Sequence, residues 1–90
     1  GMDTGPILRQ EPHLLHGNEN AAELRDLYSY RGASLLLETL EDYAKGRCEP
    51  LAQINSLATH AAKIDKAEAL IRWEESAEKI ACKVRAFNDW

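Results

Sequence analysis

The chain has 90 residues, of which 44% are hydrophobic and 29% are charged, and its formal net charge at pH 7 is -4. This length allows one domain at most, and the composition is ordinary for a soluble globular protein. Acidic residues outnumber basic ones by nine to five in residues 1–60, and each type numbers six in residues 61–90. Because no basic stripe is present, we expect no strong nucleic-acid binding by this chain alone.

Hydropathy and cysteine usage predict a cytoplasmic protein. No apolar run approaches the roughly 18 residues that span a bilayer, and no signal peptide is visible. The two cysteines, Cys48 and Cys82, match no metal-binding or redox spacing. We interpret both as reduced thiols, with a disulfide as the less favoured alternative.

Residues 1–19 begin with a polar turn, Asp3-Thr4-Gly5-Pro6, which runs into an apolar pair. A turn of this kind ordinarily connects two elements, yet only two residues precede it. Residues 7–15 suggest a short extended segment, which Pro12 limits to an edge strand or to two pieces. An aspartate beside a glycine on a tight turn can present its carboxylate to a cleft, but on these residues alone the favoured interpretation of Asp3 is an ordinary turn aspartate.

Residues 20–46 are predicted to be helical. Asn20 is a good N-cap, and Glu23 completes a capping box. Gly32 interrupts the apolar pattern and predicts either a kink or a break into two helices. Gly46 is a C-cap signal. The apolar positions that follow near-helical spacing are Leu24, Leu27, Tyr28, Leu35, Leu36, Leu40 and Tyr43.

Residues 47–74 have no clear period and are predicted to be loop or linker with short extended pieces. Within them, Asp65 and Glu68 form a second capping box, and residues 70–73 are apolar enough for a strand or a packed linker. Residues 75–88 predict the clearest helix, with Glu75 and Lys79 as an i, i+4 pair. Its apolar stripe consists of Ala77, Ile80, Ala81, Val84 and Phe87.

Other chemical candidates have a structural or solvent-facing interpretation. A metal site needs three or four ligands, and His13 and His16 have no third ligand near them in sequence, so we predict no metal. The remaining polar and aromatic groups are interpreted as structural or as a solvated helix face: Ser34, Tyr28, Tyr30, Tyr43, Glu38, Glu41 and Asp42.

The ending "IRWEESAEKIACKVRAFNDW" resembles the linker helix of the methionyl-tRNA formyltransferase family. The matching positions are Ile71, Trp73, Ser76, Ala77, Ile80, Arg85, Ala86, Phe87, Asn88 and Trp90. The upstream matches, in order and spacing, are the D-T-G-P-I-L turn, residues 31–40, Gly46, Pro50, Gln53, Ala58, Thr59, Ala61, Lys63 and Ile64. The chain departs from the family pattern at Arg72, where the family has aspartate, and at Asp89, where it has proline.

The resemblance implies a formyl transfer from 10-formyltetrahydrofolate to the amine of methionyl-tRNA. The segment predictions above give a fold that is mainly α, a small helical domain with one or two short extended segments, and the resemblance implies that it derives from the C-terminal part of a Rossmann-like formyltransferase domain. The resemblance also implies three catalytic residues: an oxyanion-stabilising asparagine, a histidine two residues later, and an aspartate at the position of Asp3. No asparagine here is followed two residues later by histidine, and the folate-binding part and the C-terminal domain are missing.

We therefore expect a fragment or truncated homologue that is inactive alone and has no cofactor-binding or metal-binding residues of its own. The alternatives are a stand-alone helical interaction module and one half of a split formyltransferase. Because the sheet that such a helix covers in the family is missing here, we also expect a homodimer through the helix at residues 21–45.

Overall fold

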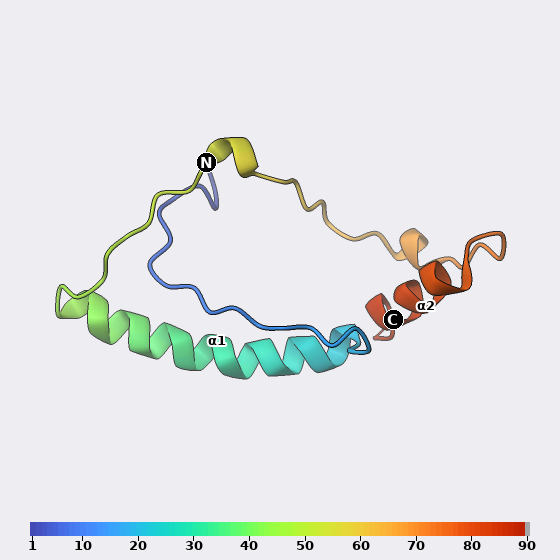
Figure 1. Ribbon diagram of the computed structural model, residues 1–90, viewed down its shortest axis with the longest axis horizontal. Helices are drawn as coiled ribbons and strands as arrows, with labels where there is room; N and C mark the ends of the chain where they lie inside the picture. The colour runs from blue at the N-terminus through green and yellow to red at the C-terminus, as the bar shows by residue number, and fades with distance from the viewer. Residues whose placement is uncertain (90) are drawn as a thin grey trace. The chain divides into compact units, whose positions relative to one another are not determined.

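The computed structural model describes residues 1–89 (Figure 1). Trp90, the last residue of the matching motif, lies outside the described residues. The chain order is a long helix α1 (Ala21–Ala44), two 3₁₀ turns (Asn55–Leu57 and Lys66–Ala69) and a short helix α2 (Ala77–Ala86). Within residues 1–89 the regular structure is helical, apart from one isolated antiparallel bridge. The prediction of a mainly α fold is confirmed.

The helix α1 begins at the predicted capping box. The side-chain Oδ1 of Asn20 accepts a hydrogen bond from the Glu23 backbone N–H at 2.9 Å, and Glu23 Oε2 accepts one from the Asn20 N–H at 3.0 Å. These two bonds satisfy backbone donors that a helix start otherwise leaves without partners.

The predicted break into two helices at Gly32 is wrong, because α1 is helical without interruption from Ala21 to Ala44. A glycine costs about 1 kcal/mol in a helix interior, which a helix of 24 residues tolerates. No atom lies within 4 Å of a Cβ built at Gly32, so the glycine fills no close-packing role.

The helix α1 ends in a Schellman motif at Gly46. Gly46 has a positive φ of 68°, its N–H donates to the Tyr43 carbonyl at 3.1 Å, and the Arg47 N–H donates to the Asp42 carbonyl at 2.8 Å. This pair of bonds defines the motif, and a left-handed residue is required at its turn. The sequence-based C-cap is therefore confirmed in its geometry.

The helix α2 lies inside the range predicted for it. Its N-cap is Ser76, whose Oγ accepts from the Lys79 N–H at 3.3 Å. The predicted i, i+4 pair of Glu75 with Lys79 is wrong, because Glu75 precedes the cap and pairs instead with Lys83 at 3.0 Å.

The two remaining segment predictions have different outcomes. The capping box at Asp65 is present and opens the 3₁₀ turn Lys66–Ala69, as predicted. Of the two alternatives for residues 70–73, a strand is absent, because that stretch is irregular. The extended pieces predicted at 7–15 and 47–74 reduce to a single bridge between Ile7 and Leu51.

The chain divides into two compact units, each described here by itself. Unit 1 comprises residues 1–13 and 30–60, and unit 2 comprises residues 14–29 together with 61 onward. Each unit therefore joins part of α1 to a distant stretch of chain. In residues 1–89, neither helix is long and apolar enough to cross a membrane.

Little of the apolar surface is covered. Among residues 1–89 no hydrophobic side chain is buried, and the one buried residue is Thr39. The exposed area is 8085 Å², whereas a compact protein of 10.1 kDa exposes about 5,300 Å², and two separate units of half that mass about 6,400 Å² together. The excess means that the units leave uncovered apolar area that folded domains ordinarily bury.

Candidate functional site

The turn that carries Asp3 has an unusual backbone conformation. Asp3 has a φ of 60°, in the left-handed region. This region costs most L-residues roughly 1–2 kcal/mol, and aspartate is one of the few that visit it routinely. Within residues 1–89 no hydrogen bond or ion pair engages the Asp3 carboxylate, and the residue is exposed.

The turn is held by a distant stretch of unit 1. Gln53 Nε2 donates to the carbonyls of Asp3 at 3.0 Å and Gly5 at 2.7 Å. Just beyond, Ile7 and Leu51 exchange two backbone hydrogen bonds of 2.8 Å each. Figure 1 shows the result as the close approach of the blue N-terminal stretch to the yellow-green stretch that follows α1.

Asp3 borders a hollow of about 500 Å³ between these two stretches. The lining side chains other than Asp3 are uncharged, and most of them are apolar. The lining residues are Asp3, Thr4, Ile7, Gln10, Leu51, Ala52, Gln53, Ile54, Asn55, Leu57 and Ala58. Asp3 is the charged residue among them, so any ligand here would meet one carboxylate and an otherwise uncharged wall.

Arg9, in the segment that follows the Asp3 turn, forms ion pairs with two side chains of α1. Arg9 Nη1 lies 3.2 Å from Glu38 Oε2, and Arg9 Nη2 is hydrogen-bonded to Asp42. Arg47 Nε also pairs with Asp42, at 3.2 Å. The prediction of a purely solvated acidic face is therefore wrong for Asp42, whose side chain is half-buried between two guanidinium groups.

The histidines do not gather into a ligand set. Arg31 Nη1 donates to His13 Nδ1 at 3.0 Å and also pairs with Glu11 at 3.4 Å. In the described part of the chain, no group of three or more histidine, cysteine or acidic side chains is placed to hold a metal ion.

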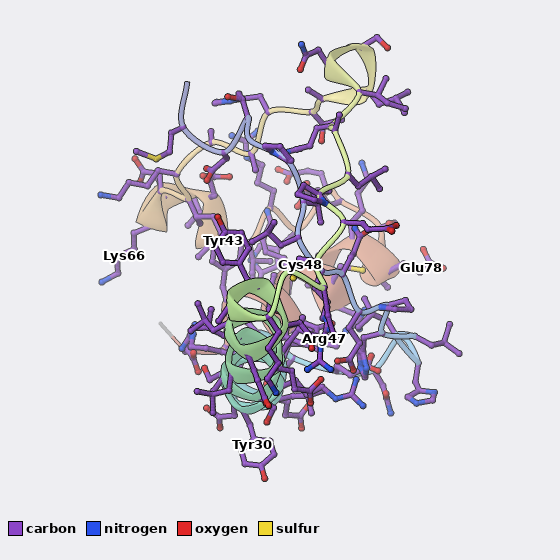
Figure 2. All side chains as sticks on the ribbon, turned by 90° about the vertical axis from the view of Figure 1, so that its left-hand side faces the viewer. Tyr30, Tyr43, Arg47, Cys48, Lys66 and Glu78 are labelled. Atoms are coloured by element: carbon purple, nitrogen blue, oxygen red, sulfur yellow. The ribbon has the colours of Figure 1, made fainter. Side chains whose placement is uncertain are left out.

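Both thiols are free, and they differ in exposure. Cys48 is half-buried and its Sγ donates to the Thr39 carbonyl at 3.6 Å. Cys82 is exposed, and its Sγ accepts from Arg85 Nη2 at 3.4 Å. Figure 2 shows Cys48 beside the end of α1, and Tyr30 projecting away from that helix, as expected of a helix-surface aromatic.

In unit 2, the residues that follow α2 contact the first turn of α1. Asn88 Oδ1 accepts from the Ala22 N–H at 3.4 Å, and Asp89 forms an ion pair with Arg25. Asp89, which stands where the family pattern has proline, therefore forms an ion pair with α1.

On the other side of unit 2, Lys83 connects α2 to the segment before it. Its Nζ donates to the Leu70 carbonyl at 2.9 Å and to Glu75 at 3.0 Å. The hydrogen bond from Lys83 lowers the pKa of Glu75. Nothing in the structure explains the arginine at position 72.

Comparison with known proteins shows which family the chain resembles. A family model described as "Formyl transferase, C-terminal domain" matches residues 63–90. Over 88 residues the chain is 46% identical to the methionyl-tRNA formyltransferase of Coxiella burnetii (strain RSA 493 / Nine Mile phase I), covering 98% of this chain and 28% of that protein. The resemblance to methionyl-tRNA formyltransferases is confirmed.

Two further relatives give the same picture. The methionyl-tRNA formyltransferase of Legionella pneumophila (strain Paris) is 40% identical over 90 residues, and that of Xylella fastidiosa (strain M12) is 38% identical over 91 residues. Both alignments cover 100% of this chain, and they cover 29% and 30% of the two relatives. The chain therefore spans less than a third of the length of the methionyl-tRNA formyltransferases that it matches.

Sequence reasoning singled out Asp3 but assigned no role to the side chains around it. Gln53 was one match among many in the resemblance to methionyl-tRNA formyltransferases, and the structure shows that it contacts the Asp3 turn. Arg9 had no signal at all, because its partners lie 29 and 33 residues away.

Proposed function

We propose that this chain supplies the aspartate turn and the linker helix of a methionyl-tRNA formyltransferase, and that it does not transfer formyl groups by itself. One observation carries the proposal: the Asp3 carboxylate, at the position that the family resemblance implies, stands unengaged at the edge of a hollow. The turn beneath it is fixed by side-chain and backbone bonds, which favours a presented carboxylate over a frayed end.

The role of such a carboxylate is to orient a base. A carboxylate that accepts a hydrogen bond from an imidazole N–H fixes the tautomer of the histidine and stabilises the imidazolium that forms when it takes a proton. In the family, that proton comes from the amine that attacks the formyl carbon. The histidine, and an asparagine that stabilises the developing oxyanion, would have to come from a segment outside this chain.

The residues around Asp3 do not fit the cofactor by themselves. In the family, 10-formyltetrahydrofolate supplies the formyl group, and its tail is anionic. The hollow beside Asp3 has no lysine or arginine in its lining, so nothing there would offset that charge. We therefore assign no cofactor contact to this chain.

The first test uses the purified 90-residue chain. We expect no formylation of methionyl-tRNA from 10-formyltetrahydrofolate and no tight folate binding by calorimetry. Removing a single oxyanion donor already costs about 10²- to 10³-fold in rate, and here the donor, the base and the cofactor site are all supplied elsewhere. Transfer by the pure chain would contradict the proposed inactivity.

The second test asks whether Asp3 serves the reaction. A chimaera would carry this chain in place of the 88-residue matching segment of the Coxiella burnetii relative. We expect the chimaera to formylate methionyl-tRNA and Asp3→Asn to lower kcat by at least about 10²-fold, because losing the carboxylate that orients a histidine base costs up to about 10⁴-fold. Asparagine also tolerates a positive φ, so the thermal stability should stay nearly unchanged.

The matched control is Asp26→Asn, the same chemical change at an exposed position on α1. It should leave the rate of the chimaera unchanged. An Asp3→Asn chimaera with the full rate would remove Asp3 from the reaction.

Two alternatives have their own support. Three exposed leucines on α1, Leu36, Leu37 and Leu40, favour a helical interaction module, which would bind a partner without any formyl transfer. A split enzyme would instead recover transfer when the remaining part of the relative is added as a separate chain. Mixing the two purified chains and measuring formylation separates these two possibilities.

A further inference from the structure

A single side-chain amide joins the two ends of the Asp3 turn. Gln53 Nε2 lies 3.0 Å from the Asp3 carbonyl oxygen and 2.7 Å from the Gly5 carbonyl oxygen. Both neighbours are acceptors, and only the amide nitrogen of glutamine carries two N–H donors. The contacts therefore fix which end of the amide faces the turn.

This amide provides the connection between the turn and the rest of unit 1. The Thr4 hydroxyl donates to the Gly1 carbonyl at 2.6 Å, which is a local bond between residues three apart. The backbone bonds between Ile7 and Leu51 secure the chain only four residues after Asp3. Among the described residues, Gln53 is the distant residue that donates hydrogen bonds to residues 3–5.

The conformation that Gln53 holds decides where the carboxylate points. The φ of Asp3 is 60°, and the direction of a Cα–Cβ bond relative to the chain follows from the backbone dihedrals. If the residue relaxed to a negative φ, the carboxylate would leave the edge of the hollow. Two bonds to the carbonyls on either side of Thr4 oppose that rotation.

We propose that Gln53 is a positioning residue for Asp3: it donates to the backbone of the turn and thereby holds the Asp3 carboxylate in the direction that formyl transfer requires. This inference rests on the proposed function of Asp3. Gln53 itself touches neither the carboxylate nor any reacting atom.

Two substitutions separate the donor role from mere bulk. Gln53→Glu has nearly the same shape but places acceptor oxygens against two carbonyls, so both bonds are lost. Gln53→Lys keeps an N–H donor at the end of a chain of similar reach. Gln10→Glu is the matched control, because Gln10 lies on the same hollow and neither of the hydrogen bonds to the turn carbonyls comes from it.

The first experiment is NMR on the full chain. In the wild type we expect NOEs from the Gln53 side-chain amide protons to residues 4 and 5, and an Asp3 three-bond amide coupling that indicates a positive φ. Gln53→Glu should lose the NOEs and change the coupling, whereas Gln53→Lys and Gln10→Glu should keep the coupling. Absence of the NOEs in the wild type, or an unchanged coupling in Gln53→Glu, would overturn the inference.

The second experiment measures kinetics of the formyltransferase chimaera. Gln53→Glu should lower kcat by about 10- to 100-fold, the effect of a reacting group displaced by roughly an ångström, with KM unchanged, and Gln53→Lys should recover most of the rate. A lower kcat that Gln53→Lys does not recover, or a rise in KM alone, contradicts positioning through donated hydrogen bonds.

The outcomes distinguish the two proposals. If Asp3→Asn retains the full rate, the proposed function fails, and the NMR result still decides whether Gln53 holds the turn. If Asp3→Asn loses activity and Gln53→Glu does not, the proposed function stands and the positioning role is wrong.

Discussion

Single side chains set the local geometry just before α1. Glu19 accepts hydrogen bonds from the backbone N–H of His16 at 2.6 Å and of Gly17 at 2.9 Å. Gly17 has a φ of 97°, so the chain reverses here in a conformation that glycine adopts without strain. The His16 bond is the largest cause that lowers the pKa of Glu19 from 4.5 to about 2, and the N–H groups of Glu19 and Gly17 add to it.

This lowered pKa predicts a pH dependence of the loop. A carboxylate with a depressed folded-state pKa stabilises the fold above its unfolded value, and that contribution is lost as the pH falls. We expect the loop at residues 16–19 to loosen between pH 4.5 and about 2, seen as faster amide exchange at His16 and Gly17. Carboxyl ¹³C titration should give the depressed pKa directly.

The control for this titration is Glu19→Gln, which keeps the shape and removes the charge. It should make amide exchange in the loop independent of that protonation step. An ordinary titration of Glu19 near pH 4.5 would mean that these backbone bonds are not formed in solution.

At the scale of the element, two glycines of the α1 region predict opposite results for one substitution. A Cβ built at Gly32 or Gly46 meets no atom within 4 Å, so the difference between them is backbone conformation alone. Gly46→Ala forces an L-residue to a φ of 68° and should cost about 1–2 kcal/mol. Gly32→Ala sits in continuous helix and should stabilise by about 0.5–1 kcal/mol.

Far-UV circular dichroism through thermal unfolding measures both changes. Helix content should fall in the Gly46 variant and rise in the Gly32 variant. Equal effects of the two substitutions would show that α1 does not end in a left-handed turn.

The elements were predictable from sequence where their signals are local. Asn20 with Glu23, and Asp65 with Glu68, act across three residues, and such pairs can be recognised in a linear pattern. The contacts of Gln53 and Arg9 could not be found in this way, because their partners are 29 to 50 residues distant and no periodicity links such positions. The role of Asp3 came only from resemblance, since a turn aspartate alone carries no specific signal.

At the scale of the whole molecule, the main feature is a set of exposed leucines on α1. The sequence pattern identified the apolar positions of the helix, but it did not show which leucines the chain covers. Leu24, Leu27 and Leu35 are half-buried. Leu36, Leu37 and Leu40 are 58%, 69% and 55% exposed, so the uncovered stripe lies in the second half of the helix.

We propose, on this basis, that the chain self-associates as a dimer through that stripe. Covering three leucines from each of two copies, already about 40% covered, contributes about 5–11 kcal/mol, against an association cost of about 4–15 kcal/mol. Sedimentation should show a dimer in the micromolar range, and Leu36→Asp should dissociate it.

The matched control is Ser56→Asp, which adds the same charge at an exposed position outside α1. It should leave the dimer intact. A wild-type chain that remains monomeric up to about 1 mM would contradict the dimer.

The two thiols differ in exposure, so their relative rates of alkylation can report local opening of the chain. Cys82 should react with a maleimide at nearly the rate of a free thiol, because it is exposed. Cys48, half-buried and bonded to the Thr39 carbonyl at the end of α1, should react more slowly than Cys82 and faster when that end detaches. Mass spectrometry of the two alkylated peptides over time would then time that opening, with Cys82 as the internal standard. Any partner that stabilises the end of α1 should lower the rate of labelling at Cys48 and leave the rate at Cys82 unchanged.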